Sequence, residues 1–491
     1  MILELLASAV INPNLEKLEL IPYGQNTVQQ NQEKIIEQRK VIPPYEKTFF
    51  IPEKINKDFK SISNEYKTVS SKVIKDFNLR KSDTKQFLKW VNLPEEQLKI
   101  HGRKSHLDEI YAQADYFRMK TKYPRPLVVL GIGGSKHTAE FLLNMNGLGN
   151  KGRVYFYSDI DPVSFFNFIK EIDTPINEIN FLVVSKSGTT FETKDSVDRF
   201  ERMLYEYYRN NGFNDKDARK AAQSHFAICT DKHATSKNLR GKIGSKNGIG
   251  NAYTKELYIH DGVGGRFSMF DDAGIFVSAY AGVPKSRMVR ILKSAKAITN
   301  FCLSDDIEKN PAMMSAIFNN FSDKNGYTLT QQQYFGRIFE NGGENWIKQL
   351  YLESLKSFEF NASKAPDSMH YAAESLFYPD NTNKYKVVMT VMPPFISQNY
   401  NKYVSAILES YAERVPVEFE VLLTEADTIS PEAIGSYVQC KHFEVLYTGM
   451  LNRVVKNMTQ PEKLPEVLQP NVEVYKNKFK PNSKYELKPG M

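Results

Sequence analysis

Two short segments rich in glycine and serine follow apolar runs in the first half of the chain. They are Gly131–Ser135 and Ser185–Thr190. Both place small residues and hydroxyl groups just before a predicted helix, where unpaired backbone N–H groups and the positive end of the helix dipole favour an anion. Lys186 adds a positive charge to the second segment. Together the two segments favour a monophosphate as the ligand.

Two nucleotide-binding motifs are the alternatives at these segments. A dinucleotide-binding G-x-G-x-x-G motif needs glycine where Lys136 stands, although Asp159 after the next predicted strand could mimic its ribose-binding acid. A P-loop needs Gly-Lys-Ser/Thr after four spacer residues, and neither segment has it. Glycine-rich turns between a strand and a helix also occur for steric reasons alone. Two hydroxyl-bearing turns in one predicted sheet still favour the phosphate.

A third glycine-rich segment, Asp261–Ser268, carries Arg266. Its three glycines within four residues let the backbone bend sharply and approach a ligand closely. An arginine presented by such a turn can stabilise negative charge that develops during a reaction. The alternative is an arginine that is solvated at the surface, and the residues alone leave both interpretations open.

A predicted helix around 344–358 carries a carboxylate on a largely apolar face. The residues of that face are Trp346, Gln349, Leu350 and Glu353. Desolvation would raise the pKa of Glu353 and suit it to general base catalysis. An ion pair with a nearby Lys or Arg is the structural alternative. His370 and Lys476 are weaker candidates, because they lie in a polar segment and a basic tail.

The elements that must position these residues alternate between apolar strands and helices. Predicted strands lie in the segments 126–135, 154–159, 181–190, 225–231 and 256–261. Uniformly apolar strands separated by helices are typical of a parallel sheet covered on both faces. A second set has predicted helices at 286–302, 311–320, 344–358 and 431–455, and strands at 385–392 and 419–426. We therefore expect an α/β fold with two doubly wound parallel-sheet domains.

Changes in composition place the expected domain boundaries. The predicted units are a mostly helical N-terminal region without a strong strand signal, two α/β domains and a C-terminal segment, at 1–125, 126–290, 291–455 and 456–491. Segment 244–251 is expected to be a surface loop. The first eleven residues are apolar but contain Glu4 and lack a basic lead, so we expect a short helix and not an export signal.

Composition excludes several classes of protein. The 491 residues include 65 Lys and Arg and 57 Asp and Glu, and a net charge of +8 is too small to indicate nucleic-acid binding. Three distant cysteines exclude a disulfide framework and a cysteine-rich zinc site, and no H-E-x-x-H spacing occurs, so we expect no metal. No apolar run reaches about 18 residues. We expect a cytoplasmic enzyme without a membrane span.

Several motifs, in one order, resemble the glucose-6-phosphate isomerase (phosphoglucose isomerase) family, particularly its bacterial branch. They cover roughly residues 125–480 and read GIGGS, SKSGTT, TDK, DGVGGRFS, GENWIKQLYLES and QPNVEVYK. The N-terminal hundred residues show no such match. The resemblance implies two sugar-isomerase-type (SIS) domains, a homodimer, and interconversion of glucose 6-phosphate and fructose 6-phosphate without a cofactor.

The resemblance also implies a role for each candidate residue. The phosphate would be held by Gly134, Ser135, Ser185, Lys186, Ser187 and Thr190. Glu353 would move a proton between C2 and C1, and Arg266 would stabilise the enediolate between those steps. His370 of a neighbouring subunit would open the sugar ring together with Lys476. The residues implied to line the sugar are Gln349 and Gln469.

The chain departs from the family pattern in three places. The departing residues are Leu355–Ser357 after the Glu-Ser pair, Asp367–Met369 and Glu374 around the histidine, and Leu468 and Asn471 near the C-terminus. They motivate two alternatives: a sugar-phosphate-binding regulator that has lost catalysis, and a broader phosphoglucose and phosphomannose isomerase.

Overall fold

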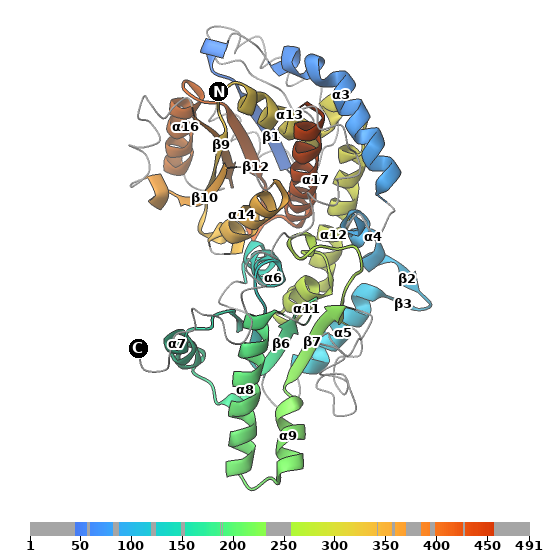
Figure 1. The fold of residues 1–491 in the computed structure, drawn as a ribbon, viewed down its shortest axis with the longest axis vertical. Helices are drawn as coiled ribbons and strands as arrows, with labels where there is room; N and C mark the ends of the chain where they lie inside the picture. Colours follow the sequence, from blue (N-terminus) through green and yellow to red (C-terminus); the bar gives the residue numbers. More distant parts are fainter. Residues whose placement is uncertain are drawn as a thin grey trace, which may run out of the picture.

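The computed structural model shows two lobes, each built around a five-stranded sheet (Figure 1). It describes residues 45–55, 59–81, 88–118, 124–148, 153–186, 188, 190–231, 257–340, 342–355, 359–369, 384–392, 398–425 and 428–455. The predictions for the first eleven residues, for loop 244–251 and for segment 456–491 lie outside the described residues.

The first sheet contains the five predicted strands, all parallel, in the order β5-β4-β6-β7-β8. Its strands are β4 (Leu127–Leu130), β5 (Val154–Tyr157), β6 (Asn180–Val184), β7 (Phe226–Asp231) and β8 (Leu257–Ile259). Leu127 and Val129 of β4 pack into one core, and Val128 and Leu130 pack into another. Both faces of the sheet are therefore covered, which explains why its strands are apolar at every position.

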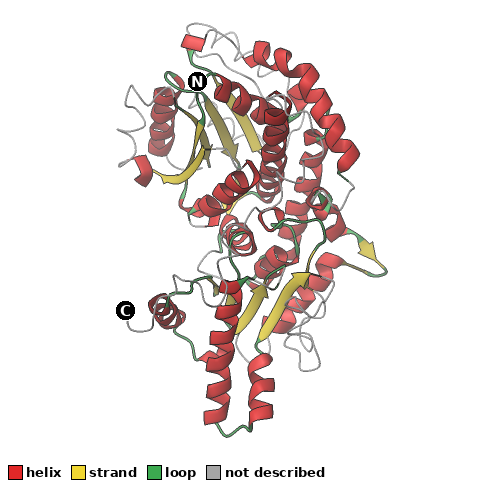
Figure 2. Ribbon diagram, in the orientation of Figure 1, coloured by secondary structure: helices red, strands yellow, loops and turns green. Residues whose placement is uncertain are grey.

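Helices cover both faces of the first sheet (Figure 2). They are α5 (His106–Arg118), α6 (Gly134–Met145) and α11 (Asp272–Tyr280) on one face, and α7 (Pro162–Ile172), α8 (Phe191–Asn210) and α9 (Asp215–Gln223) on the other. Helices α8 and α9 extend together from the lower end of the molecule (Figure 1). This arrangement confirms the predicted doubly wound architecture in the first lobe.

The second sheet has the order β1-β12-β11-β9-β10. Its strands are β1 (Tyr45–Phe50), β9 (Leu329–Phe335), β10 (Glu359–Ala365), β11 (Tyr385–Val391) and β12 (Val417–Leu422). Strands β9 to β12 are parallel, and β1 is antiparallel to β12. The sequence analysis missed β9 and β10 because their residues are largely polar. In β9 the buried Gln332 donates to Thr390 Oγ1 at 2.8 Å, so its amide is satisfied inside the sheet.

The N-terminal region contributes a strand that the sequence analysis did not predict. Its helices are present as α3 (Phe59–Arg80), α4 (Leu93–Leu98) and α5, but β1 lies at the edge of the second sheet. A short hairpin also joins β2 (Ile100–His101) to β3 (Lys104–Ser105). The region therefore covers parts of both lobes, with α5 on the first and α3 on the second, and extends the second sheet.

The second lobe contains the four predicted helices. They are α12 (Lys285–Cys302), α13 (Pro311–Lys324), α14 (Gly342–Leu355) and α17 (Pro431–Val455), joined by α16 (Gln398–Ala412) and the short strands β13 (Thr424–Glu425) and β14 (Thr428–Ile429). Helices α12 and α17 pack closely at Gly435, where a Cβ would lie 2.1 Å from the Ile291 carbonyl oxygen. Among the described helices, none combines the length and the apolarity needed to cross a bilayer.

A buried ionic network fixes β1 to the second lobe. Lys47 Nζ lies 2.6 Å from Glu418 Oε1 and 2.7 Å from Glu444 Oε2, and Lys441 Nζ lies 2.8 Å from Glu420 Oε1. All five side chains are buried, and burial raises the pKa of Glu418. Removing one cation would leave carboxylates without compensation in a medium of low dielectric constant.

We predict that Lys47→Ala lowers the free energy of unfolding by about 3–5 kcal/mol, because it leaves buried charges unpaired. Urea denaturation followed by circular dichroism measures this change. Lys75→Ala, at an exposed position of α3, is the control and is expected to change stability by less than about 0.5 kcal/mol. Equal stabilities of the two variants would show that the network contributes nothing.

Candidate active site

Arg266 lies on a single turn, Gly265–Phe267, between β8 and α11. Its side chain is only 2% exposed. Arg266 Nη1 lies 3.2 Å from Glu353 Oε2, and Arg266 Nε donates to Ser354 Oγ at 2.8 Å. Burial lowers the pKa of Arg266 to about 10, although Glu353 opposes this shift, so the guanidinium stays charged at neutral pH. The structure therefore brings together the two residues predicted to carry the chemistry.

Close backbone packing holds the Arg266 turn. A Cβ on Gly134 would lie 2.2 Å from the carbonyl carbon of Gly265 and 2.4 Å from the backbone nitrogen of Arg266. Trp346 Nε1 donates to the carbonyl oxygen of Arg266 at 3.0 Å. Position 134 must therefore be glycine for the first glycine segment to lie against the Arg266 turn.

Helix α14 presents the carboxylate, as predicted from its spacing. Trp346 and Leu350 are buried, and Gln349 Nε2 donates to Glu353 Oε1 at 2.8 Å. The Glu353 side chain is 37% exposed, so the expectation of a strongly desolvated carboxylate is wrong. Its ion-pair partner is Arg266. The expected alternative, an ion pair, is therefore present, and the partner is the residue predicted to stabilise the enediolate. One oxygen of this carboxylate is held by an amide and the other by a guanidinium.

The first glycine segment leads from β4 into the N-terminus of α6. Gly133 has a φ of +58°, and a Cβ there would lie 2.7 Å from Gln349 Nε2. Ser135 is half-buried in the first turn of α6. The unpaired backbone N–H groups of this helix end thus lie beside Gln349 and the Arg266 turn, where they suit an anion.

The second segment follows β6, which pairs with β4. Lys186 Nζ donates to the carbonyl oxygen of Val263 at 3.0 Å, and Ser185 Oγ accepts from the backbone N–H of Gly188 at 3.1 Å. Thr190 is the N-cap residue of α8. Burial lowers the pKa of Lys186. This lysine links the second segment to Val263 of the third glycine-rich segment, which in turn contacts the first segment and α14.

Four predicted site residues lie outside the described part of the chain, namely Ser187, His370, Gln469 and Lys476. Their expected roles therefore stay predictions. Two contacts of the site were missed: Ser354, which accepts from Arg266 Nε, and Val263, which accepts from Lys186. No spacing in the sequence could reveal them, because both contacts join segments far apart in the chain.

The fold and site define a sugar-isomerase-type (SIS) α/β protein. Among solved structures, a hypothetical protein from Thermus thermophilus superposes with a TM-score of 0.65 at 17% identity, over 82% of this chain and 96% of its own. A glucose-6-phosphate isomerase from Chlamydia trachomatis superposes with a TM-score of 0.55 at 17% identity, over 77% of this chain and 80% of its own. At these identities the likeness shows the fold alone.

The chain belongs to the phosphoglucose isomerase family, whose model matches residues 34–354. This match begins well before the first motif, so the expectation that the N-terminal hundred residues lie outside the resemblance is wrong from residue 34 onward. Two curated relatives are glucose-6-phosphate isomerases from Clostridium novyi, 27% identical over 55% of each chain, and from Mycoplasmoides gallisepticum, 23% identical over 54% of this chain and 56% of that protein. The chain thus spans only about half of the length of these relatives.

We predict that Gly134→Ala disturbs the site, because the added Cβ would overlap the backbone of the Arg266 turn. Overpacking of this kind costs about 1–3 kcal/mol. The free energy of unfolding is measured by urea denaturation. Gly264→Ala is the matched control, since its Cβ would meet only Phe267 Cδ2 at 3.6 Å. A Gly134→Ala variant as stable as the control would contradict the close packing.

Proposed function

We propose that this chain is an aldose–ketose isomerase that interconverts glucose 6-phosphate and fructose 6-phosphate through an enediolate. The observation that carries the proposal is the contact of Arg266 with Glu353 beside the N-terminus of α6, at the carboxyl ends of the first sheet. Ligands of doubly wound sheets bind at this edge. Membership of the phosphoglucose isomerase family supports the same reaction.

In the proposed reaction, the phosphate binds at the N-terminus of α6 with Gly134 and Ser135 and at the second segment with Ser185, Lys186, Ser187 and Thr190. The binding energy of this remote group orients C1 and C2. One oxygen of Glu353 takes the proton from C2 of the aldose, and the electron pair of that C–H bond forms the enediolate. The same carboxyl group then returns the proton to C1 while the hydroxyl proton of O2 passes to O1, which gives the ketose.

Arg266 stabilises the charge that develops on the enediolate oxygens. Its guanidinium is held in place before substrate binds, so little reorganisation is needed when the charge appears. Gln349 orients Glu353 through its hydrogen bond and lies beside the first segment, where it would also meet the sugar. No cofactor enters any of these steps.

The remaining roles rest on the family resemblance. We propose that His370, supplied by a second subunit, opens the sugar ring with Lys476 at the ring oxygen, and that Gln469 lines the sugar. The active form is then a homodimer, which we place in the cytoplasm and in glycolysis and gluconeogenesis. Its partners are small sugar phosphates, and neither nucleic acid nor membrane takes part.

We predict that Glu353→Gln lowers kcat for fructose 6-phosphate by about 10²–10⁴-fold, because an amide cannot accept the C2 proton. A coupled assay of glucose 6-phosphate formation measures this loss. Glu344→Gln, the same change in the first turn of α14, is the control and is expected to leave kcat nearly unchanged. An active Glu353→Gln enzyme would remove this residue from proton transfer, and wild-type protein that binds the sugar phosphate without turnover would favour a regulator instead.

Ser354 is expected to act as a positioning residue, since its hydroxyl oxygen accepts from Arg266 Nε. We predict that Ser354→Ala lowers kcat by about 10–100-fold, the effect of losing one hydrogen bond to a charged group. KM is expected to stay within about twofold, because the phosphate contacts are intact. Ser354→Thr keeps the hydroxyl and should restore most of kcat. An unchanged kcat in Ser354→Ala would show that this bond does not orient the guanidinium.

A further inference from the structure

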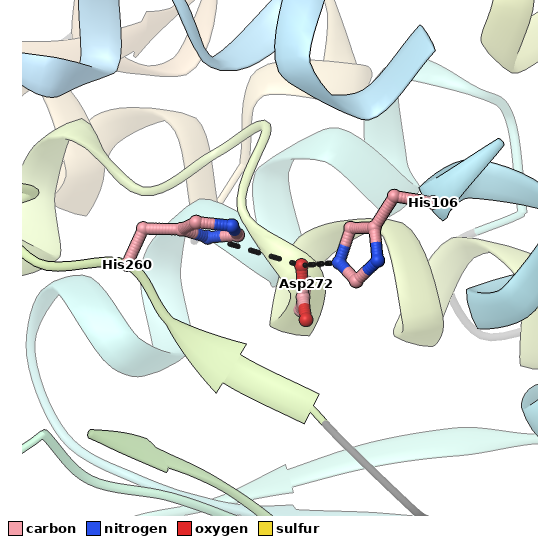
Figure 3. A group of neighbouring side chains, drawn as sticks. All are labelled: His106, His260 and Asp272. Carbon is pink, nitrogen blue, oxygen red and sulfur yellow. Dashed lines mark hydrogen bonds and ion pairs between the residues drawn. The ribbon is translucent and has the colours of Figure 1, made fainter. Parts of the chain in front are cut away.

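Two histidines and an aspartate lie close together near the two ends of the segment 261–268, which carries Arg266 (Figure 3). His106 opens α5, His260 follows β8, and Asp272 is the first residue of α11. His106 Nε2 lies 2.9 Å from Asp272 Oδ1, and the ring of His260 lies beside the same oxygen, with its Nδ1 at 4.0 Å. The three side chains each offer one ligand atom, and these atoms all lie within 4.8 Å of one another. We call this group the His-His-Asp cluster.

The separations in the cluster suit a common metal ligand sphere. Nitrogen and carboxylate ligands bind zinc at about 2.0–2.2 Å in a tetrahedral arrangement, which separates the ligand atoms by about 3.3–3.6 Å. His106 Nε2 is slightly closer to Asp272 Oδ1 than this, and no pair of ligand atoms is further apart than 4.8 Å. An ion at this point would replace the hydrogen bond between His106 Nε2 and Asp272 Oδ1, an oxygen that also accepts from Gln97 Nε2 at 3.2 Å.

A second carboxylate supports one of the ligands. Asp271 Oδ1 lies 2.5 Å from His260 Nδ1, and Asp271 Oδ2 accepts from the backbone N–H of His260 at 3.1 Å. Histidines that bind a metal through one ring nitrogen usually donate through the other to a carboxylate of this kind. Asp271 thus holds Nδ1 of His260, so an ion would have to displace the proton from the other ring nitrogen, Nε2, and the ring is placed beside the cluster by the 4.0 Å from its Nδ1 to Asp272 Oδ1.

The charges of the group match a divalent cation. The side chains of Asp271 and Asp272 are fully buried, while those of His106 and His260 are 21% and 24% exposed. The two buried carboxylates carry a charge of −2, which either two imidazolium groups or one divalent ion bound to neutral imidazoles would balance. The partly exposed imidazoles give that ion a route from solvent to the buried Asp272.

We propose that the His-His-Asp cluster binds one divalent transition-metal ion, with His106, His260 and Asp272 as its ligands and Asp271 as the outer support of His260. Imidazole and carboxylate ligands in this combination suit zinc and iron(II). The sequence analysis expected no metal because it relied on closely spaced ligand motifs, whereas these ligands come from three separate elements.

The ion would fasten the N-terminal region to both ends of the segment that carries Arg266. His260 precedes this segment and Asp272 follows it, so a shared ion would hold its two ends together. His106 ties the same point to α5. The ion would have a structural role and would take no part in proton transfer. The metal-site proposal therefore does not depend on the proposed isomerase activity.

Protons are the competing way to balance the same charge. The hydrogen bond to Asp272 raises the pKa of His106. For His260, burial lowers the pKa, but the contacts with Asp271 and Asp272 together outweigh burial and raise the pKa to about 9. Two imidazolium groups would leave no need for an ion. The test is therefore a direct measurement of bound metal at about pH 8, where zinc competes better with protons.

The experiment uses the full chain, stripped with EDTA and transferred to metal-free buffer, with zinc chloride as the probe. We expect one zinc per chain by calorimetry and by elemental analysis after desalting, and a melting temperature that rises with zinc concentration. His106→Ala and His260→Ala are each expected to weaken zinc binding at least about tenfold. His101→Ala, at an exposed position of the β2–β3 hairpin, is the matched control and should bind zinc like the wild type.

Two results would overturn the proposal. One is wild-type protein that binds no zinc at micromolar concentrations, which would leave protons as the balancing charge. The other is zinc binding that is unchanged in the double variant of His106 and His260, which would place the metal elsewhere. Circular dichroism of each variant shows whether it is folded, and Asp272→Asn provides a further ligand substitution if one histidine variant does not fold.

Discussion

The structure around the site depends on a buried guanidinium and the carboxylate beside it. Moving the Arg266 cation out of water is costly unless its donors meet acceptors, and Glu353 and Ser354 supply these from one helix. Arg266 belongs to the segment that follows β8 of the first sheet. Helix α14 connects β9 to β10 of the second sheet along the chain. This contact therefore joins the two lobes at the point where the substrate is proposed to bind.

The other features of the site follow from the need to hold this contact. Gly134 lets the first glycine segment reach the backbone of the Arg266 turn, and Trp346 satisfies the carbonyl oxygen of that turn. Lys186 attaches the second segment through Val263. A helix N-terminus suited to phosphate is thus fixed relative to the base and the cation, which is the arrangement that an enediolate mechanism requires.

The hydrophobic pattern and the local motifs predicted those parts of the molecule in which apolar residues are buried and glycines form turns. The apolar strands of the first sheet, the helix that carries Glu353 and the glycine-rich turn of Arg266 were all found in this way. Strand β1 was missed because its Lys47 is satisfied by acids more than 350 residues away in the sequence. Strands β9 and β10 were missed because their polar side chains find partners only in the folded sheet. The degree of exposure of Glu353 was also misjudged, since helical spacing shows which residues share a face but not how far a neighbouring lobe covers it.

The central claim is that the Glu353 carboxylate moves a carbon-bound proton while Arg266 stabilises the enediolate. The most direct test is to convert fructose 6-phosphate in D2O and to follow C2 of glucose 6-phosphate by NMR. Because the Glu353 side chain is 37% exposed, a proton held by it can exchange with solvent, and the account predicts deuterium at C2 in the product of the wild type and none with Glu353→Gln. Conversion by Glu353→Gln at the wild-type rate, with the same deuterium at C2, would contradict proton transfer through this carboxylate.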